Sequence, residues 1–461
     1  MFNTEFFDID GLMLIGAGVN MLFSNKDLKK LIIPLLLEQT LAITVGMADT
    51  IMVSSVGEAA ISGVSLVDMF NNLIISVLSA LATGGAVVTS QFIGAGHKND
   101  ACRSAKQLIF TATLITLFIS VLVIAFNKPI LSLFFGKIED DVMINAVIYM
   151  VISALSFPFL AVYNSCAALF RSMGNSQITF KVSLLMNVIN IGGNALCIFG
   201  LHMGVEGVAI PSLVSRGVAG LVLFILLKNP NNMIYITKEK FKVELDVIKR
   251  ILYIGIPSGI ENGIFQLGRV LVVSIIAGFG TVQIAANGVA NSLDGMGCIV
   301  GQAMNLAMIS VIGRCAGAGD EKQIRHYTKK LLGITYLFTA IVNSTILLLL
   351  NNILTIYSLS PETTRLAYTL VMIHNGFAML LWPASFVLPN MLRACNDVKF
   401  TMVISIFSMF VFRIGFSYVI GVNMGMGAVG VWLAMLMDWG FRVICFIGRY
   451  LRGKWKLNVC T

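Results

Sequence analysis

Charged side chains are scarce in this sequence. Only 12% of its 461 residues are charged, whereas 57% are hydrophobic, and the mean hydropathy is +0.87. A soluble protein needs a largely polar surface, so this composition excludes most soluble classes. Apolar runs of about 20 residues, the length that crosses a bilayer, recur along the whole chain and leave no room for a soluble domain.

The sequence also lacks the usual signatures of metal, disulfide and enzyme chemistry. Its eight cysteines form no CxxC pair and have no histidine at metal-ligand spacing, so we interpret them as reduced hydrophobic residues. The apolar segments contain no paired-aspartate, serine–histidine or HExxH arrangement. We therefore expect neither an enzyme nor a bound cofactor.

The apolar runs predict an all-α integral membrane protein with twelve transmembrane helices. The predicted spans cover residues 31–55, 63–93, 106–127, 143–170, 177–200, 205–227, 249–278, 286–316, 329–355, 366–392, 400–420 and 428–450.

The basic residues predict the orientation of these spans. They form short clusters between apolar runs rather than one basic face, which argues against nucleic acid as the reason for the net charge of +9. If the N-terminus is cytoplasmic, the inside segments hold 26 of the 32 lysines and arginines, and only Lys128, Lys137 and Arg365 lie outside. The positive-inside rule therefore places both termini in the cytoplasm. This predicts a multi-pass protein of the cell membrane, with residues 1–30 as a cytoplasmic lead-in and 451–461 as a cytoplasmic tail.

The two halves of the chain repeat each other. Pro34 and Glu38 recur 223 residues later as Pro257 and Glu261. Six spans separate each repeated pair, so the halves share one orientation and form two six-helix lobes related by a pseudo-two-fold axis along the membrane normal. A proline inside a span removes a backbone donor and favours a kink, which makes Pro34 and Pro257 candidate hinges. We predict an N-lobe, a cytoplasmic linker and a C-lobe at residues 31–227, 228–248 and 249–450.

Asp49, in the first span, is the strongest candidate for chemistry. A carboxylate inside a membrane needs a partner or a proton and is a functional-site candidate for that reason. In the fifth span Asn187, Asn190 and Asn194 follow helical spacing and share one face. With Asp49 and with Ser212 of the sixth span, they would form an oxygen-rich site for a small hard cation, including sodium. Interhelical hydrogen bonding is the alternative role of the asparagines.

The C-lobe spans contain both acids and bases, and two interpretations stay open for them. Buried charges without partners are rarely tolerated, so the set forms either a neutralised structural network or a binding site. Glu38 and Glu261 follow the repeated prolines by one turn, which fits either a shared gating role or snorkelling to the inner interface. The C-lobe set is Glu261, Arg269, Asp294, Arg413 and Asp438.

Several motifs together resemble the multidrug and toxic compound extrusion (MATE) transporters, over essentially the whole chain from Lys26 to Lys456. They are Pro34 followed by Asp49, the end of the second span at residues 91–96, the turn at 171–175 with its repeat at 393–397, and the opening of the seventh span at 255–261.

This resemblance implies secondary active antiport by alternating access, in which a proton or sodium ion drives export of organic, often cationic and aromatic, compounds. It also implies a cation site at Asp49, Asn190, Asn194 and Ser212. Some members carry an acid where this chain has Asn194. We expect small organic substrates, a surrounding lipid bilayer and a monomeric transporter.

The C-lobe departs from one branch of the family. Phe265 and Trp382 stand where the NorM-like and eukaryotic branches keep acids, so the chain looks closer to the DinF-like branch, with coupling through Asp49. The alternative function is a flippase for lipid-linked precursors from the same broader superfamily. Such a flippase would use a cationic cavity, to which Arg216, Arg269 and Arg413 could contribute.

Overall fold

The computed structural model describes residues 21–136, 139–237, 241–357 and 359–458. Parts of the predicted lead-in, linker and tail, together with Lys137, lie outside these ranges. Twelve helices within the described ranges are long and apolar enough to cross a membrane, which confirms the predicted span count.

The N-lobe and C-lobe are built from consecutive helices. The N-lobe contains α1 (Asn25–Ser54), α2 (Glu58–Gly94), α3 (Lys98–Ala125), α4 (Asn127–Phe135), α5 (Asp140–Ser172), α6 (Ser176–Ala195), the π-helical η2 (Leu196–Gly200) and α7 (Glu206–Leu227). The C-lobe contains α8 (Leu245–Ala277), α9 (Thr281–Gly297), α10 (Ile299–Gly317), α11 (Glu321–Ile356), α12 (Pro361–Trp382), η3 (Pro383–Val387), α13 (Leu388–Ala394), α14 (Val398–Ser408), η4 (Met409–Gly415), η5 (Ser417–Asn423), α15 (Gly427–Arg452) and η6 (Lys454–Asn458).

The first helix begins earlier than residue 31, where the sequence placed the first span. Ser24 and Asp27 form a capping box, in which the Ser24 hydroxyl accepts from the Asp27 backbone amide at 3.2 Å. The Asp27 carboxylate in turn accepts from the Ser24 amide at 3.0 Å. These bonds satisfy two exposed backbone donors and start α1 at Asn25, within the predicted lead-in.

The eighth span is broken, although its apolar run predicts one helix. It ends as α9 at Gly297 and restarts as α10 at Ile299, with Cys298 between them. A Cβ added to Gly297 would lie 2.5 Å from Oδ1 of Asn343, so the glycine allows α11 to approach closely. The sequence also gave no sign of α4, whose apolar run is too short to cross a membrane.

The turns of the two lobes confirm the internal repeat. Gly57 and Gly280 precede α2 and α9 with φ of 140° and 98°, and Gly96 and Gly319 follow α2 and α10 with φ of 77° and 67°. Each pair is 223 residues apart, and glycine is the residue that adopts such positive φ values without strain. Two clusters of buried apolar side chains lie mainly in the N-lobe and mainly in the C-lobe, but Leu31 and Leu35 of α1 belong to the second cluster, and Ile251 and Ile254 of α8 belong to the first.

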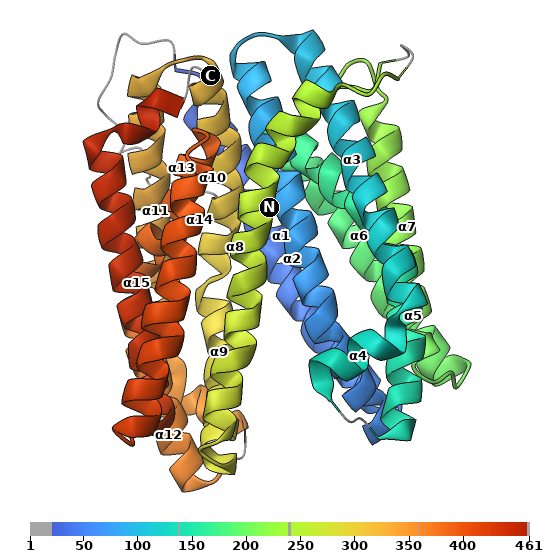
Figure 1. Ribbon diagram of the computed structural model, residues 1–461, viewed down its shortest axis with the longest axis vertical. Helices are drawn as coiled ribbons and strands as arrows, with labels where there is room; N and C mark the ends of the chain where they lie inside the picture. Colours follow the sequence, from blue (N-terminus) through green and yellow to red (C-terminus); the bar gives the residue numbers. More distant parts are fainter. Residues whose placement is uncertain (1–20, 137–138, 238–240, 358, 459–461) are drawn as a thin grey trace, which may run out of the picture.

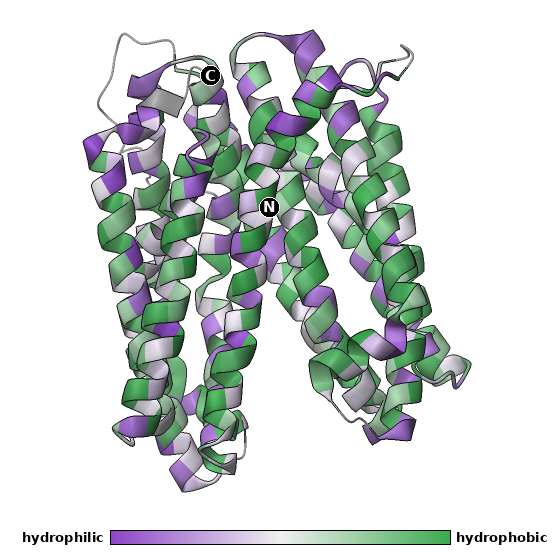
Figure 2. Cartoon of the chain, viewed as in Figure 1, coloured by the Kyte–Doolittle hydropathy of each residue, from purple (hydrophilic) through white to green (hydrophobic). Residues whose placement is uncertain are grey.

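The lobes meet at one end and diverge at the other (Figure 1). In Figure 1 the N-lobe lies on the right and the C-lobe on the left, and their ribbons separate toward the bottom, where α4 and α12 lie. Packing of α2 against α8 and α10, and of α1 against α10, joins them. Apolar residues cover much of the outer faces of both lobes (Figure 2), as expected for helices that face lipid.

Candidate functional site

Asp49 lies among polar side chains from three helices of the N-lobe. It projects from α1, and Nδ2 of Asn194 from α6 donates to its Oδ1 at 2.9 Å. Asn190, also on α6, lies beside the same carboxylate, and Ser212 of α7 contacts Asn190 at 2.9 Å. The structure therefore brings together the four residues that the sequence assigned to one cation site.

The amide of Asn190 can take two orientations, and one of them satisfies both of its neighbours. If its nitrogen donates to Ser212, its oxygen faces the Asp49 carboxylate and the two acceptors repel each other. In the reversed orientation Nδ2 donates to Asp49 Oδ1 at 3.0 Å, and Oδ1 accepts from Ser212 at 2.9 Å. We adopt this second orientation because it satisfies both atoms.

The asparagine stripe of α6 is buried and only partly satisfied. Asn187, Asn190 and Asn194 are all buried, as expected for one face of a helix turned toward its neighbours. Oδ1 of Asn194 is buried without a hydrogen-bond partner, which makes it a free oxygen ligand beside Asp49. Asn187 contacts Ser183 of its own helix at 3.4 Å and makes no bond to Asp49.

A second acid, Asp68 of α2, faces the same part of the N-lobe. Its Oδ1 accepts from the Tyr149 hydroxyl at 3.1 Å and from the Asn71 amide at 3.4 Å. Asp68 and Arg216 both interact electrostatically with Asp49. Sequence reasoning missed Asp68, although an acid inside a predicted span is the same signal that identified Asp49.

Glu261 of the C-lobe is neutralised by two arginines. Its carboxylate lies 2.7 Å from Nη2 of Arg393 and 3.3 Å from Nη2 of Arg442. All three side chains are nearly inaccessible, so the charges compensate one another inside the lobe. The sequence offered neutralisation of Glu261 as one of two interpretations, but the two arginines that provide it lie outside the predicted set.

Asp438 belongs to a different C-lobe group. Nη1 of Arg413 lies 3.6 Å from its Oδ2, and the Ser408 hydroxyl donates to its Oδ1. The guanidinium of Arg413 also stands over the ring of Phe265, 5.3 Å from its centroid. The direct contacts of the five C-lobe residues proposed as one network therefore fall into local groups, while Arg413 also interacts electrostatically with Arg269 and Asp294.

Asp294 forms the third group. Nε2 of His374 on α12 lies 2.8 Å from its Oδ1, and the Cys298 thiol donates to the same oxygen at 3.1 Å. Arg269 of α8 interacts with Asp294 electrostatically. Sequence reasoning gave His374 no role, because its partner is distant along the chain.

The repeated glutamates have repeated partners. Glu38 of α1 lies 2.7 Å from Nη2 of Arg171, and Glu261 of α8 lies 2.7 Å from Nη2 of Arg393. The Thr179 hydroxyl also donates to Glu38 at 3.1 Å. Both glutamates are buried in ion pairs within their own lobes, so neither snorkels to the interface.

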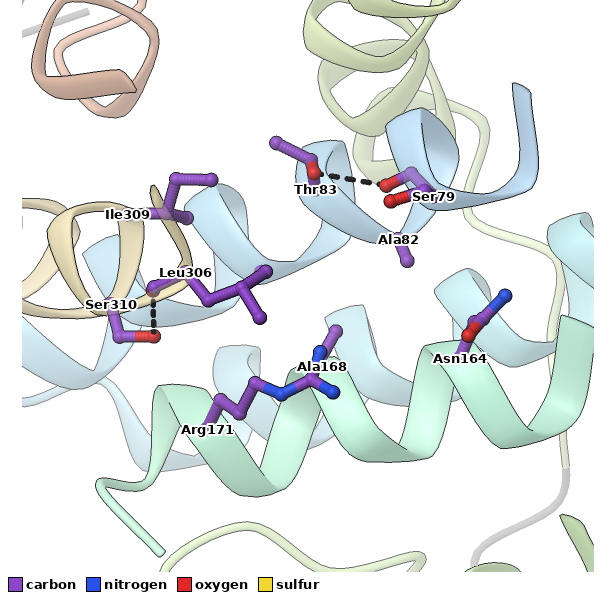
Figure 3. Close-up of a pocket in the computed structure, with 10 residues that line it drawn as sticks. Ser79, Ala82, Thr83, Asn164, Ala168, Arg171, Leu306, Ile309 and Ser310 are labelled. Atoms are coloured by element: carbon purple, nitrogen blue, oxygen red, sulfur yellow. Dashed lines mark hydrogen bonds between the residues drawn. The ribbon is translucent and has the colours of Figure 1, made fainter. Parts of the chain in front are cut away.

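A small cavity opens where the lobes meet (Figure 3). Its volume is about 40 Å³, and hydroxyl, amide and guanidinium groups line it alongside apolar side chains. The Nε atom of Arg171 is buried there without a partner. The lining comes from α2, α5 and α10 and includes Ser79, Thr83, Asn164, Arg171, Leu306 and Ser310.

Aromatic side chains fill the C-lobe positions at which the NorM-like and eukaryotic branches keep acids, as the sequence predicts. Phe265 packs edge-on against Phe386 at 6.0 Å, and Trp382 stacks on the same ring at 4.9 Å. The candidate hinges Pro34 and Pro257 lie inside the continuous helices α1 and α8.

Twelve membrane-spanning helices in two repeated lobes, with polar and ionisable groups gathered inside each lobe, define a polytopic membrane transporter. The family model MatE matches residues 34–196 and 257–419, one segment in each lobe. The chain belongs to the MatE family, which confirms the resemblance to MATE transporters, and it is a transporter rather than an enzyme.

Two relatives match nearly the full chain. The uncharacterized transporter YisQ of Bacillus subtilis (strain 168) is 28% identical over 434 residues, which cover 92% of this chain and 93% of the relative. The probable multidrug resistance protein NorM of Thermotoga maritima is 25% identical over 449 residues, which cover 94% of this chain and 93% of that protein.

Solved structures share the fold. A crystal structure of MATE in the bent conformation has a TM-score of 0.86 and 19% identity, covering 95% of this chain and 97% of that one. An outward-facing conformation of a multidrug resistance MATE family transporter has a TM-score of 0.84 and 21% identity, covering 93% of this chain and 95% of that one. These likenesses confirm the two-lobe architecture.

Proposed function

We propose that this protein exports small organic compounds by secondary active antiport, and that Asp49 carries the coupling cation. Family membership supports transport, and the names of the NorM relatives support multidrug compounds as the substrate class. In one transport cycle the compound would leave the cell and the cation would enter it, while the lobes rock around their shared interface.

One observation carries the assignment of Asp49. Glu38, Glu261, Asp294 and Asp438 each have an arginine or histidine within 4.0 Å. Within the described parts of the chain, Asp49 and its neighbour Asp68 form no such pair. The hydrogen bonds of Asp49 come from neutral amides, and those of Asp68 come from Tyr149 and Asn71. A carboxylate solvated by neutral dipoles inside a membrane has a vacancy for a positive charge that the arginine-paired acids lack.

The coupling cation is a proton or a sodium ion. A proton would bind directly to the Asp49 carboxylate. Sodium would use oxygen ligands, and the carboxylate together with the free Oδ1 of Asn194 supplies them. A bound sodium ion would also favour turning the Asn190 oxygen toward Asp49, the orientation that repulsion disfavours when the site is empty.

Orientation in the membrane follows from the basic clusters. With both termini cytoplasmic, the joined ends of the lobes face the cytoplasm and their diverging ends face outward (Figure 1). This conformation would release exported compound and admit the coupling cation from outside. We further propose that the transporter acts as a monomer in the cell membrane, closer to the DinF-like branch, with Pro34 and Pro257 as hinges.

The direct test is transport by purified protein in liposomes, with proton and sodium gradients imposed separately. A panel that includes ethidium and rhodamine 6G supplies the organic cations. We expect one of the two gradients to drive movement of at least one compound against its own gradient. Failure of both gradients to drive any compound, with active protein confirmed by binding, would contradict the proposal.

The flippase alternative receives little support from the arginines that suggested it. Arg413 is paired with Asp438, and Arg216 donates to the Ser156 hydroxyl at 2.7 Å. Arg269 interacts electrostatically with Asp294, so all three arginines have partners inside their lobes. A lipid-flipping assay run beside the dye-efflux assay distinguishes the two functions. Flipping without dye efflux would favour the alternative.

A further inference from the structure

The partner of Asp294 distinguishes it from the other acids of the C-lobe. Glu261 and Asp438 face arginines, which stay charged at any physiological pH. His374 is instead a side chain whose charge ordinarily changes between about pH 5 and 8. The Asp294–His374 pair can therefore gain and lose a proton where the arginine pairs cannot.

The hydrogen bond at the other ring nitrogen, Nδ1, indicates which nitrogen of neutral His374 carries the hydrogen. Nδ1 lies 3.1 Å from Oδ1 of Asn375, an atom that only accepts, so Nδ1 carries a hydrogen. In neutral His374 the lone pair of Nε2 would then face the Asp294 carboxylate.

Two acceptors at 2.8 Å repel each other unless a proton lies between them. The separation of Nε2 and Asp294 Oδ1 is that of an ion pair in which the ring carries the proton, although the contact does not have hydrogen-bond geometry. Loss of this proton would replace attraction between the two groups by repulsion and push α9 and α12 apart. Protonation of the Asp294–His374 pair is thus linked to the distance between α9 and α12.

The local structure gives the proton a route and the helix freedom to move. The Asp294 side chain is 24% exposed, whereas that of His374 is 0% exposed, so a proton reaches the ring through the carboxylate. The eighth span breaks at Cys298, one helical turn after Asp294. The repeat-equivalent residue of the N-lobe, Asn71, is neutral and lies in the unbroken helix α2. At this repeat position, only the C-lobe has an ionisable pair beside a helix break.

Neighbouring charges would help the proton to leave. Arg269 on α8 and Arg413 on η4 interact with Asp294 and oppose a further positive charge, while Asp438 on α15 partly offsets Arg413. Cys298 donates to the carboxylate, and α11 contributes the neutral Asn343. The indole rings of Trp432 and Trp439 on α15 enclose the imidazole edge-on at 5.3 and 5.0 Å.

We propose that Asp294 and His374 form a second, C-lobe proton-binding site that is loaded and unloaded during the transport cycle. This inference rests on the proposed ion coupling but assigns it to a lobe and to residues other than Asp49. The proton moves between solvent, the Asp294 carboxylate and Nε2 of His374, and no other bond changes.

Tryptophan fluorescence tests the site without any substrate, because an imidazolium ring quenches an adjacent indole. We expect the fluorescence of the purified protein to depend on pH, and His374→Gln to abolish the dependence that comes from this site. Asp294→Asn should also alter this titration, since the charged ring loses its anionic partner. His326→Gln, on α11 and away from both indoles, is the matched control and should leave the titration unchanged.

Transport in liposomes then tests the role of the site. With an organic cation that the wild type exports, His374→Gln should bind it normally but slow proton-driven export about tenfold or more. A titration that survives His374→Gln would overturn the proposal, as would loss of the titration with proton-driven export unchanged. Normal export by Asp49→Asn would instead contradict the proposed function, and it would leave the fluorescence result standing.

Discussion

Gln91 and Arg314 occupy repeat-equivalent positions in α2 and α10, and each donates a hydrogen bond across the lobe boundary. Nε2 of Gln91 donates to the carbonyl of Ala394 at 2.9 Å, and Nε of Arg314 donates to the carbonyl of Ser172 at 2.8 Å. The two carbonyls are themselves repeat-equivalent, 222 residues apart. The pseudo-two-fold axis therefore passes through the joined ends of the lobes, where these bonds join α2 to α13 and α10 to α5.

Close backbone packing at this junction predicts a conformational effect of small substitutions. A Cβ at Gly94 would lie 2.0 Å from the carbonyl oxygen of Arg314, so Gly94→Ala forces the joined ends apart. We expect the diverging ends to approach in response. Spin labels at Leu133 on α4 and Ile284 on α9, in a cysteine-free background, should report a shorter distance population.

The matched control for this substitution is Gly333→Ala. Gly333 lies on α11, and an added Cβ there meets no atom within 4 Å. Its distance distribution should equal that of the parent protein. An unchanged distribution in Gly94→Ala as well would contradict the role of the junction in setting the conformation.

The buried Glu38–Arg171 pair predicts non-additive losses of stability. Glu38→Gln leaves the Arg171 charge buried without its partner, which costs about 3 kcal/mol or more. Arg171→Gln should cost a similar amount, whereas the double variant should be less destabilised than the sum of the two. Thermal unfolding of the detergent-purified proteins measures the cycle, and additive losses would indicate that the two side chains act independently.

The two ends of the asparagine stripe should differ in their effect on cation binding. Asn194 donates directly to Asp49, and a hydrogen bond to a charged group is worth about 1.5–3 kcal/mol. Because this bond stabilises the ionised carboxylate, Asn194→Ala should strengthen proton binding by about 10- to 100-fold, whereas sodium would lose the Oδ1 ligand and bind more weakly. Asn187→Ala, which removes only a contact with Ser183, should leave this affinity nearly unchanged. Equal effects of the two variants would argue for a structural stripe.

Topology is open to a labelling test at two exposed turns. Lys322, at the start of α11, lies on the predicted inner side, and Glu362, at the start of α12, lies on the outer side. In a cysteine-free background, an impermeant maleimide should label Glu362→Cys in intact cells and Lys322→Cys only after lysis. Labelling of Lys322→Cys in intact cells would reverse the orientation.

Much of the architecture could be predicted from the sequence because lipid imposes a simple rule. A span must be apolar over its whole length, so the number of spans follows from the apolar runs in the sequence. The internal repeat follows from prolines, glutamates and glycines that recur in register. The break at Cys298 could not be predicted in this way, because it depends on how closely α11 approaches Gly297.

The candidate site was predictable to the extent that its signal is local. An isolated Asp49 and the spacing of Asn190 and Asn194 on one helix are visible in the sequence, and the structure brings them together. Ion pairs such as Asp294–His374 join residues from different spans, so no local pattern identifies the partner. Asp68 lies inside a predicted span and could therefore be identified from the sequence by the same signal as Asp49.

Gradient-driven export by the Asp49→Asn variant is the most direct measurement of ion coupling through the N-lobe. The amide keeps the shape and polarity of the side chain but cannot bind the coupling charge. Wild type, Asp49→Asn and the exposed-charge control Asp246→Asn would be reconstituted at equal protein levels, with the driving ion gradient imposed. We predict that Asp49→Asn loses gradient-driven export while still binding the organic cation, and that Asp246→Asn exports at the wild-type rate. Export by Asp49→Asn at the wild-type rate under the same gradient would contradict coupling through Asp49.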